Sequence, residues 1–118
     1  SQASKQAPTP KVTYTKVQKE CSSYTMDGEK QTQCRAAFTV KVKGVKKGYR
    51  VRVMATDRAH SSTYRVGAAR AKETVVKVPV AETVVSYGPK GKVRKIRFRV
   101  VVRDADGKKI FARQARTF

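Results

Sequence analysis

Apolar and polar residues alternate with a period of two through most of this sequence. The clearest stretch runs from Lys95 to Arg103, and the residues on its apolar side are Ile96, Phe98, Val100 and Val102. Because successive side chains of a β-strand point to opposite faces, this pattern predicts a strand with one buried face and one cationic face. Comparable stretches predict seven or eight strands, near residues 11–25, 30–43, 49–56, 63–66, 73–80, 83–87, 93–103 and 109–116.

Two segments fit this alternation less cleanly. The stretch from Gly67 to Glu73 is compatible with one helical turn or with a loop, and the stretch from Ile110 to Phe118 has some helical spacing. We expect a strand at the C-terminal stretch, because a hairpin signal precedes it.

That hairpin signal lies at Asp104 to Gly107. It predicts a three-residue loop, Ala105 to Gly107, with Gly107 in the left-handed conformation. The resulting register would place two pairs on the inner face, namely Val102 with Ile110 and Val100 with Ala112.

The two cysteines flank a favoured turn dipeptide, Asp27-Gly28. A two-residue type I′ turn needs positive φ at both central positions, which this dipeptide tolerates. Such a turn would put Cys21 directly opposite Cys34 in the closer of the two cross-strand arrangements, within reach of a disulfide. The bridge would contribute about 3 kcal/mol of stability and indicates a secreted, periplasmic or cell-surface protein. The alternative is a cytosolic protein with two reduced cysteines in adjacent strands.

The connection from Gly44 to Gly48 bears on the topology. In a tight hairpin Lys43 would face Arg52, which is destabilising, whereas a crossing to a second sheet avoids that pair. Immunoglobulin-like sandwiches cross in this way between their second and third strands. The strand pattern is similar to that of immunoglobulin-like and fibronectin-III-like modules, which implies an all-β, two-sheet antiparallel sandwich. The sequence has no Trp, and its cysteines are too close together for the inter-sheet bridge of antibody domains.

The length of 118 residues fits one domain. We expect residues 1–10 to be a disordered tail and residues 11–118 to form a single domain. No apolar run approaches ~18 residues, so no membrane span is expected. The 28 Lys and Arg against 8 Asp and Glu give a net charge of +20, which favours polyanionic partners. The alternative is that this charge serves solubility alone.

Residues with catalytic or metal-binding chemistry are sparse. The single histidine, His60, lies close in sequence to Asp57 and Ser62, but catalytic triads are assembled from groups on separate parts of a scaffold. We therefore expect an exposed turn there. Asp104 and Asp106 are typical turn residues, and the remaining ligands of a calcium loop are missing. Two cysteines and one distant histidine are too few for a zinc site. We expect no catalytic residue, metal or cofactor, and hence no enzyme.

The densest basic cluster runs from Lys90 to Arg99. Three of its side chains, those of Lys95, Arg97 and Arg99, would project from one strand face about 7 Å apart, which suits a line of sulfates or phosphates. The spacing from Arg94 to Arg97 is similar to the basic motifs of glycosaminoglycan-binding segments. The candidate polyanion-binding residues are Lys90, Lys92, Arg94, Lys95, Arg97 and Arg99, joined by Lys41, Lys43, Arg50 and Arg52 if their strands share a sheet. The alternative is a charged outer face that prevents aggregation.

These observations favour an exported, non-catalytic binding or adhesion module that contacts an anionic partner, such as an envelope polymer, a glycosaminoglycan or an acidic protein. A nucleic-acid-binding domain ranks second. The bases of a bound nucleic acid would need exposed aromatic residues between the cations. The tyrosines of this chain are instead scattered, at Tyr14, Tyr24, Tyr49, Tyr64 and Tyr87. A third hypothesis is a structural domain of a secretion or adhesion assembly whose charge faces a neighbouring subunit.

Overall fold

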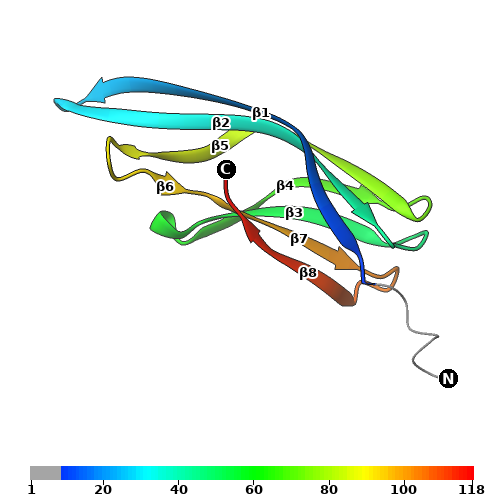
Figure 1. The fold of residues 1–118 in the computed structure, drawn as a ribbon. Helices are drawn as coiled ribbons and strands as arrows, with labels where there is room; N and C mark the ends of the chain where they lie inside the picture. Colours follow the sequence, from blue (N-terminus) through cyan, green and yellow to red (C-terminus); the bar gives the residue numbers. More distant parts are fainter. Residues whose placement is uncertain (1–8) are drawn as a thin grey trace.

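The computed structural model describes residues 9–118, apart from the side chains of residues 113 and 114. It contains two antiparallel sheets with the strand orders β1-β2-β5-β6 and β4-β3-β7-β8, here called the first and second sheet (Figure 1). The elements are β1 (Lys11–Met26), β2 (Glu29–Lys43), β3 (Arg50–Asp57), the 3-10 turn η2 (Arg58–His60), β4 (Ser62–Arg70), β5 (Val75–Pro89), β6 (Arg94–Lys95), β7 (Arg97–Arg103) and β8 (Lys109–Arg116). The predicted all-β class is confirmed. Most of the predicted tail, residues 1–8, lies outside the described residues.

The core lies between the two sheets, and it consists of the alternating residues that the sequence pattern assigned to the inner faces. The first sheet contributes Phe38, Val40, Val42, Val76, Val78 and Val80. The second sheet contributes Val51, Val53, Ala55, Phe98, Val100 and Val102. Full burial of each Val or Phe contributes about 1.5–3 kcal/mol, so these faces supply most of the force that holds the sheets together.

The C-terminal residue closes one side of this core. The Phe118 ring stacks on Phe38 with centroids 4.8 Å apart and meets Phe98 and Tyr14 edge-on at 5.6 and 5.8 Å. The Arg116 guanidinium lies 4.7 Å from the Phe118 centroid and 4.8 Å from the Tyr14 centroid, where it makes cation–π contacts. The segment that ends β8 therefore joins β1 of the first sheet to β7 of the second.

The predicted hairpin and disulfide are both confirmed. Asp27 and Gly28 have φ values of 52° and 79°, and Met26 pairs with Glu29 across the turn. Cys21 pairs with Cys34, their Cα atoms lie 4.0 Å apart, and the two sulfurs form a disulfide. Figure 1 shows β1 and β2 running past the end of the second sheet as a long ribbon. The bridge ties the two strands together in this ribbon, and it is consistent with an oxidising compartment.

The chain crosses between the sheets three times, from β2 to β3, from β4 to β5 and from β6 to β7. The first crossing lies where the sequence predicted it, and the third divides a predicted strand. The connection from Gly44 to Gly48 carries the chain from β2 in the first sheet to β3 in the second. The predicted strand 93–103 is divided, because β6 pairs with β5 whereas β7 pairs with β3. Ile96, buried between β6 and β7, donates its N–H to the Val85 carbonyl at 2.9 Å. One alternating run thus supplies both sheets without a break in its inner face.

Three other predictions need correction. The predicted strands 73–80 and 83–87 form one strand, β5, whose pairing with β2 shifts register between Ala36 and Phe38. Of the stretch from Gly67 to Glu73, the part from Gly67 to Arg70 belongs to β4 and is neither helical nor a loop. This part of β4 lies so close to β5 that a Cβ on Gly67 would be 2.9 Å from Val78 Cγ1. Residues 71–73 lie in the β4–β5 connection, as the loop alternative expected.

The third correction concerns the β7–β8 hairpin. Its loop is as predicted, with Gly107 at φ 88° and the Asp104 N–H bonded to the Lys108 carbonyl at 2.9 Å. The predicted pairs are wrong, because a bulge after Lys109 shifts the register by one residue. Val102 faces Phe111 and Val101 faces Ala112, which leaves Ile110 42% exposed.

Candidate polyanion-binding face

The outer face of the second sheet is covered with arginines. The outward positions alternate with the buried valines of β3 and β7 and continue onto β4 on both sides of its bulge. We call this surface the arginine face, and its members are Arg50 and Arg52 on β3, Arg65 and Arg70 on β4, and Arg97, Arg99 and Arg103 on β7. All are exposed except Arg103, which is half-buried.

Strand pairing fixes the arrangement of these side chains. Arg50 lies directly opposite Arg70 on one side and Arg103 on the other. Met54 similarly lies between Arg65 and Arg99. Neighbouring strands are about 4.8 Å apart and outward positions along a strand about 7 Å apart. The face is therefore a two-dimensional array of guanidinium groups rather than a single row.

Two hollows indent this array where small side chains lie among the arginines. The first has a volume of about 230 Å³ and is lined by Arg50, Arg52, Arg65 and Arg70 around Ala68. The second, also about 230 Å³, is lined by Arg97, Arg99 and the neighbouring Arg58 around Thr56 and Ala115. Each hollow offers guanidinium donors from more than one element to a group of the size of a sulfate, phosphate or carboxylate.

The arginine face holds no acidic side chain. The acidic residues of the described chain lie elsewhere, in the turns at Asp27–Glu29 and Asp104–Asp106, in the connection before β5, on β1 and β5, and at Asp57. Among the side chains that the structure describes, the one ion pair joins His60 to Asp57. Like charges directly opposite one another destabilise a sheet by about 0.2–1 kcal/mol per pair. The protein thus maintains this array without internal compensation.

The candidates predicted from the sequence fall into three groups. Arg97 and Arg99 share the second sheet with Arg50 and Arg52, so the structure brings these four together. Lys41 and Lys43 lie in the first sheet. Lys41 pairs with Thr13 and Lys77, and Lys43 pairs with Lys11 and Val75. The third group comprises Lys90 and Lys92 in the β5–β6 turn and Arg94 and Lys95 on β6, all exposed and paired only with the first sheet.

Lys95, Arg97 and Arg99 do alternate with buried Ile96 and Phe98 as expected. They do not form one row on one sheet, because the chain changes sheets at Ile96.

Three members of the arginine face were not among the predicted candidates. Arg103 was placed on the outer face of its strand but lies outside the dense basic cluster. Arg65 and Arg70 lie on β4, whose Gly and Ala residues weakened the strand signal. The signal that could have located them is a period of two in the outward positions, interrupted by one unpaired bulge residue at Val66, next to Gly67.

The turn around His60 forms a small polar cluster. The Tyr87 hydroxyl donates a hydrogen bond to Asp57 Oδ2 at 2.7 Å and lies 2.8 Å from His60 Nδ1. His60 Nδ1 lies 3.1 Å from Asp57 Oδ2, and the Ala59 N–H donates to Asp57 Oδ1 at 3.1 Å. Since Asp57 ends β3 and Tyr87 lies on β5, this cluster links the two sheets. The His60 side chain is 67% exposed, as the sequence-based interpretation of an exposed turn requires.

The cluster has the electrostatics of a structural link. Burial alone would raise the pKa of the Asp57 carboxyl, but hydrogen bonds from Tyr87, His60 and the Ala59 N–H outweigh this effect and lower it. Burial raises the pKa of the Tyr87 hydroxyl, and its hydrogen bond to the Asp57 carboxylate raises it further. Asp57 is therefore held as an anion and Tyr87 as a neutral donor.

In the described part of the chain, no group of three or more His, Cys, Asp or Glu side chains is placed to hold a metal ion. No helix of residues 9–118 is long and apolar enough to cross a membrane. Comparison of the chain with known protein families, with curated proteins and with solved structures found no match.

Proposed function

We propose that this chain is a non-catalytic binding module of an oxidising compartment, and that its arginine face binds an anionic polymer outside the cytosol. A sulfated polysaccharide or a phosphate-rich envelope polymer has the required chemistry. The observation that carries this proposal is the uncompensated array of arginines on three adjacent strands. We also infer a sandwich of the immunoglobulin or fibronectin type III kind, which the β2-to-β3 crossing supports.

The use of arginine in place of lysine supports an oxoanion ligand. In the first sheet, two of the four residues that pair with Lys41 and Lys43 are lysines, namely Lys11 and Lys77. The arginine face carries arginine at every cationic position of β3, β4 and β7. A guanidinium presents a planar fork of donors that matches the two oxygens of a sulfate, phosphate or carboxylate, whereas an ammonium acts as a point charge.

Nucleic acid fits this face less well. Proteins that bind single strands without sequence preference stack bases on aromatic side chains between cations. Tyr14, Tyr49 and Tyr87 instead pack against the core, and Tyr24 lies on the β1–β2 ribbon. Tyr64 pairs with inward-facing Ala55. An ordered disulfide also favours an extracytoplasmic setting over the nucleus or cytosol.

A charge-conserving exchange tests the proposal. In one variant Arg52, Arg65 and Arg99 become lysine, and in the matched control Lys41, Lys43 and Lys77 become arginine, so both keep the net charge of +20. The affinities of the two variants are compared by calorimetric titration with heparin, polyphosphate and an oligothymidine at one salt concentration. We expect the arginine-to-lysine variant to bind heparin or polyphosphate at least tenfold more weakly, which corresponds to the loss of one charge-assisted hydrogen bond.

Diffuse attraction to a protein of charge +20 gives a different result. In that case the two variants would bind all three polymers as the unmodified protein does, and the proposal would be wrong. Tightest binding to oligothymidine would favour the nucleic-acid alternative. A second pair of variants measures the charge itself: Arg52, Arg65 and Arg99 to Gln against the exposed residues Lys19, Lys30 and Lys72 to Gln. Equal losses from the two triple variants would mean that the arginine face is no site.

A further inference from the structure

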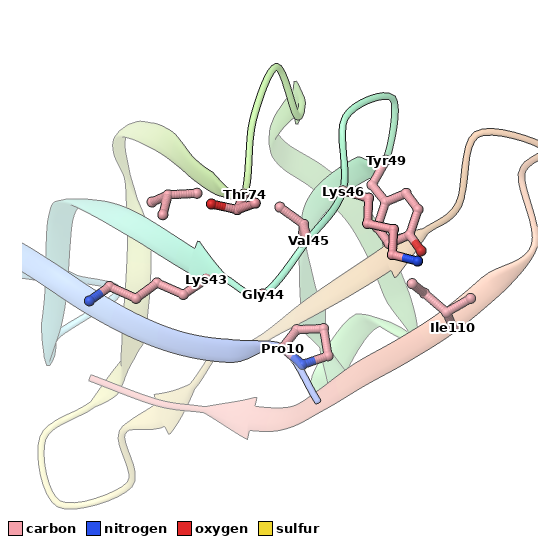
Figure 2. Close-up of a pocket in the computed structure, with 9 residues that line it drawn as sticks. Pro10, Lys43, Gly44, Val45, Lys46, Tyr49, Thr74 and Ile110 are labelled. Atoms are coloured by element: carbon pink, nitrogen blue, oxygen red, sulfur yellow. The ribbon is translucent and has the colours of Figure 1, made fainter. Parts of the chain in front are cut away.

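A pocket of about 490 Å³ lies at the end of the molecule where the chain passes between the sheets (Figure 2). Its walls are mainly apolar and include Val45, Tyr49, Val75 and Ile110. Ligand pockets of proteins have volumes of about 300–1,000 Å³ and are lined mostly by apolar side chains with a few placed polar groups. This pocket has the size and lining of such a site, and it lies outside the arginine face.

Hydrogen bonds between two connections hold the walls in place. The N–H groups of Gly44 and Val45 donate to the Thr74 carbonyl at 3.0 and 3.3 Å. The Gly48 N–H donates to the Ala71 carbonyl at 2.8 Å, and the Ala71 N–H donates to the Tyr49 carbonyl at 2.7 Å. The β2–β3 and β4–β5 connections are thereby tied to each other. A ligand would find the pocket already formed, so its binding would pay little ordering cost.

Ile110 reaches this pocket because of the bulge in β8. Its side chain is 42% exposed, and it lies with Tyr49 and Lys46 at one end of the pocket (Figure 2). In the register predicted from the sequence Ile110 would instead face Val102 in the core. The bulge thus moves a large apolar side chain out of the core and onto the wall of an open apolar pocket.

The charged residues that line the pocket are both cationic. These residues are Lys43 and Lys46, and their amino groups lie at opposite ends of the pocket (Figure 2). Lys11 faces Lys43 across the β1–β2 pair and adds a third cation nearby. The pocket is lined by no Asp or Glu. An apolar chamber with a cationic rim is complementary to a molecule that has a hydrocarbon chain and one anionic end.

We propose that this pocket binds a single-chain aliphatic anion such as a fatty acid. The chain lies against Val45, Val75 and Ile110, and the carboxylate pairs with Lys43 or Lys46. This site is independent of the arginine face, so either proposal can fail without the other.

Calorimetric titration with dodecanoate and dodecyltrimethylammonium, each below its micelle concentration, tests this site. We expect dodecanoate to bind saturably with one molecule per chain and the cation to bind at least tenfold more weakly. Ile110→Asp should weaken dodecanoate binding at least tenfold, whereas Val93→Asp should leave it unchanged. Val93 is the matched control because it is 41% exposed and lies in the β5–β6 turn, away from the pocket.

Lysine variants test the anionic end separately. Lys46→Gln should weaken dodecanoate binding about two- to fivefold, the range expected for an exposed ion pair, and Lys72→Gln should not. The proposal is overturned if dodecanoate binding does not saturate, or if Ile110→Asp and Val93→Asp weaken dodecanoate binding equally. It is also overturned if dodecyltrimethylammonium binds as tightly as dodecanoate. Binding to vesicles of anionic phospholipid without binding to dodecanoate would also overturn it. If the protein bound dodecanoate but not heparin, the arginine-face proposal would fail and the pocket proposal would stand.

Discussion

Gly67→Ala tests how closely the two sheets approach each other. A Cβ at this position would lie 2.9 Å from Val78 Cγ1 and 3.3 Å from both the Pro79 carbonyl oxygen and Val80 Cγ2. Optimal carbon–carbon contacts are about 3.5–4.0 Å, so β4 would have to move away from β5 by roughly 0.6 Å or more. Overpacking of this kind costs about 1–3 kcal/mol. In an unobstructed strand the same substitution would instead stabilise the fold by about 0.5–1 kcal/mol, so the sign of the change is decisive.

A double-mutant cycle with Val78→Ala identifies the obstructing atom. Val78 is fully buried, so its truncation alone should cost about 2 kcal/mol. Truncation also removes Cγ1, the nearest atom to the new Cβ, so the double variant should cost at least about 1 kcal/mol less than the sum of the single changes. Equilibrium unfolding in guanidinium chloride with the disulfide intact measures all four proteins. A neutral or stabilising Gly67→Ala, or strictly additive changes, would refute the close approach of β4 and β5.

Four further predictions concern the hydrogen bonds, the disulfide and the arginine face. Tyr87→Phe should cost about 1.5–3 kcal/mol of stability at pH 7, since it removes a hydrogen bond to a carboxylate. Folding lowers the pKa of Asp57, so this contribution is present above the ordinary value of 3.8 and is lost as the pH falls through the folded pKa; urea unfolding of both proteins at pH 7 and pH 3 checks it. His60→Ala should change stability by less than about 0.5 kcal/mol in the same assay, because its side chain is exposed. Mass measurement after alkylation without reductant should show no modified cysteine, and two alkylated cysteines would contradict the bridge and the compartment inferred from it. The double variant Cys21→Ala, Cys34→Ala should lose about 3 kcal/mol of stability. Arg50→Thr should raise the melting temperature of the free protein while it weakens heparin binding, because it removes two like-charge cross-strand pairs; a lower melting temperature would count against that repulsion.

The features that the sequence predicted correctly are those fixed by local chemistry. Alternation assigned the inner faces of β2, β3, β5 and β7, since side-chain direction in a strand depends only on position parity. The Asp27-Gly28 turn aligned Cys21 with Cys34, because a two-residue turn fixes the register of the strands beside it. Both inferences use information within about fifteen residues of chain.

The features that it missed depend on packing between distant segments. Ile96 continues the alternation of its neighbours, so nothing local indicates that the chain changes sheets there. The bulge that displaces Ile110 leaves the Asp104–Gly107 loop intact and acts one residue beyond the turn. Gly67 looked like a loop residue, although glycine is required there because β5 comes so close. In each case the deciding contact lies on another strand.

Charge repulsion does not account for the β2–β3 crossing. A clash between Lys43 and Arg52 was the reason to reject a tight hairpin, and the crossing is present. The fold nevertheless places Lys43 opposite Lys11 and Lys41 opposite Lys77. Cross-strand repulsion of less than about 1 kcal/mol per pair is too small to choose a topology when each buried Val contributes about 1.5–3 kcal/mol. Burial of the apolar faces decides where the strands lie, and the charges are then placed on whatever faces remain outside.

This order of magnitudes also limits what can explain the arginine face. Because burial sets the topology, the outward positions are free to carry any polar residue, and a sheet surface that only needs solubility carries charges of both signs interspersed. Arg50 instead faces two arginines directly, an arrangement that lowers stability and that a single acidic residue on β4 or β7 would relieve. Under the proposed function, a bound polyanion would remove this repulsion and add its own attraction. Ligand binding and folding stability should therefore rise together.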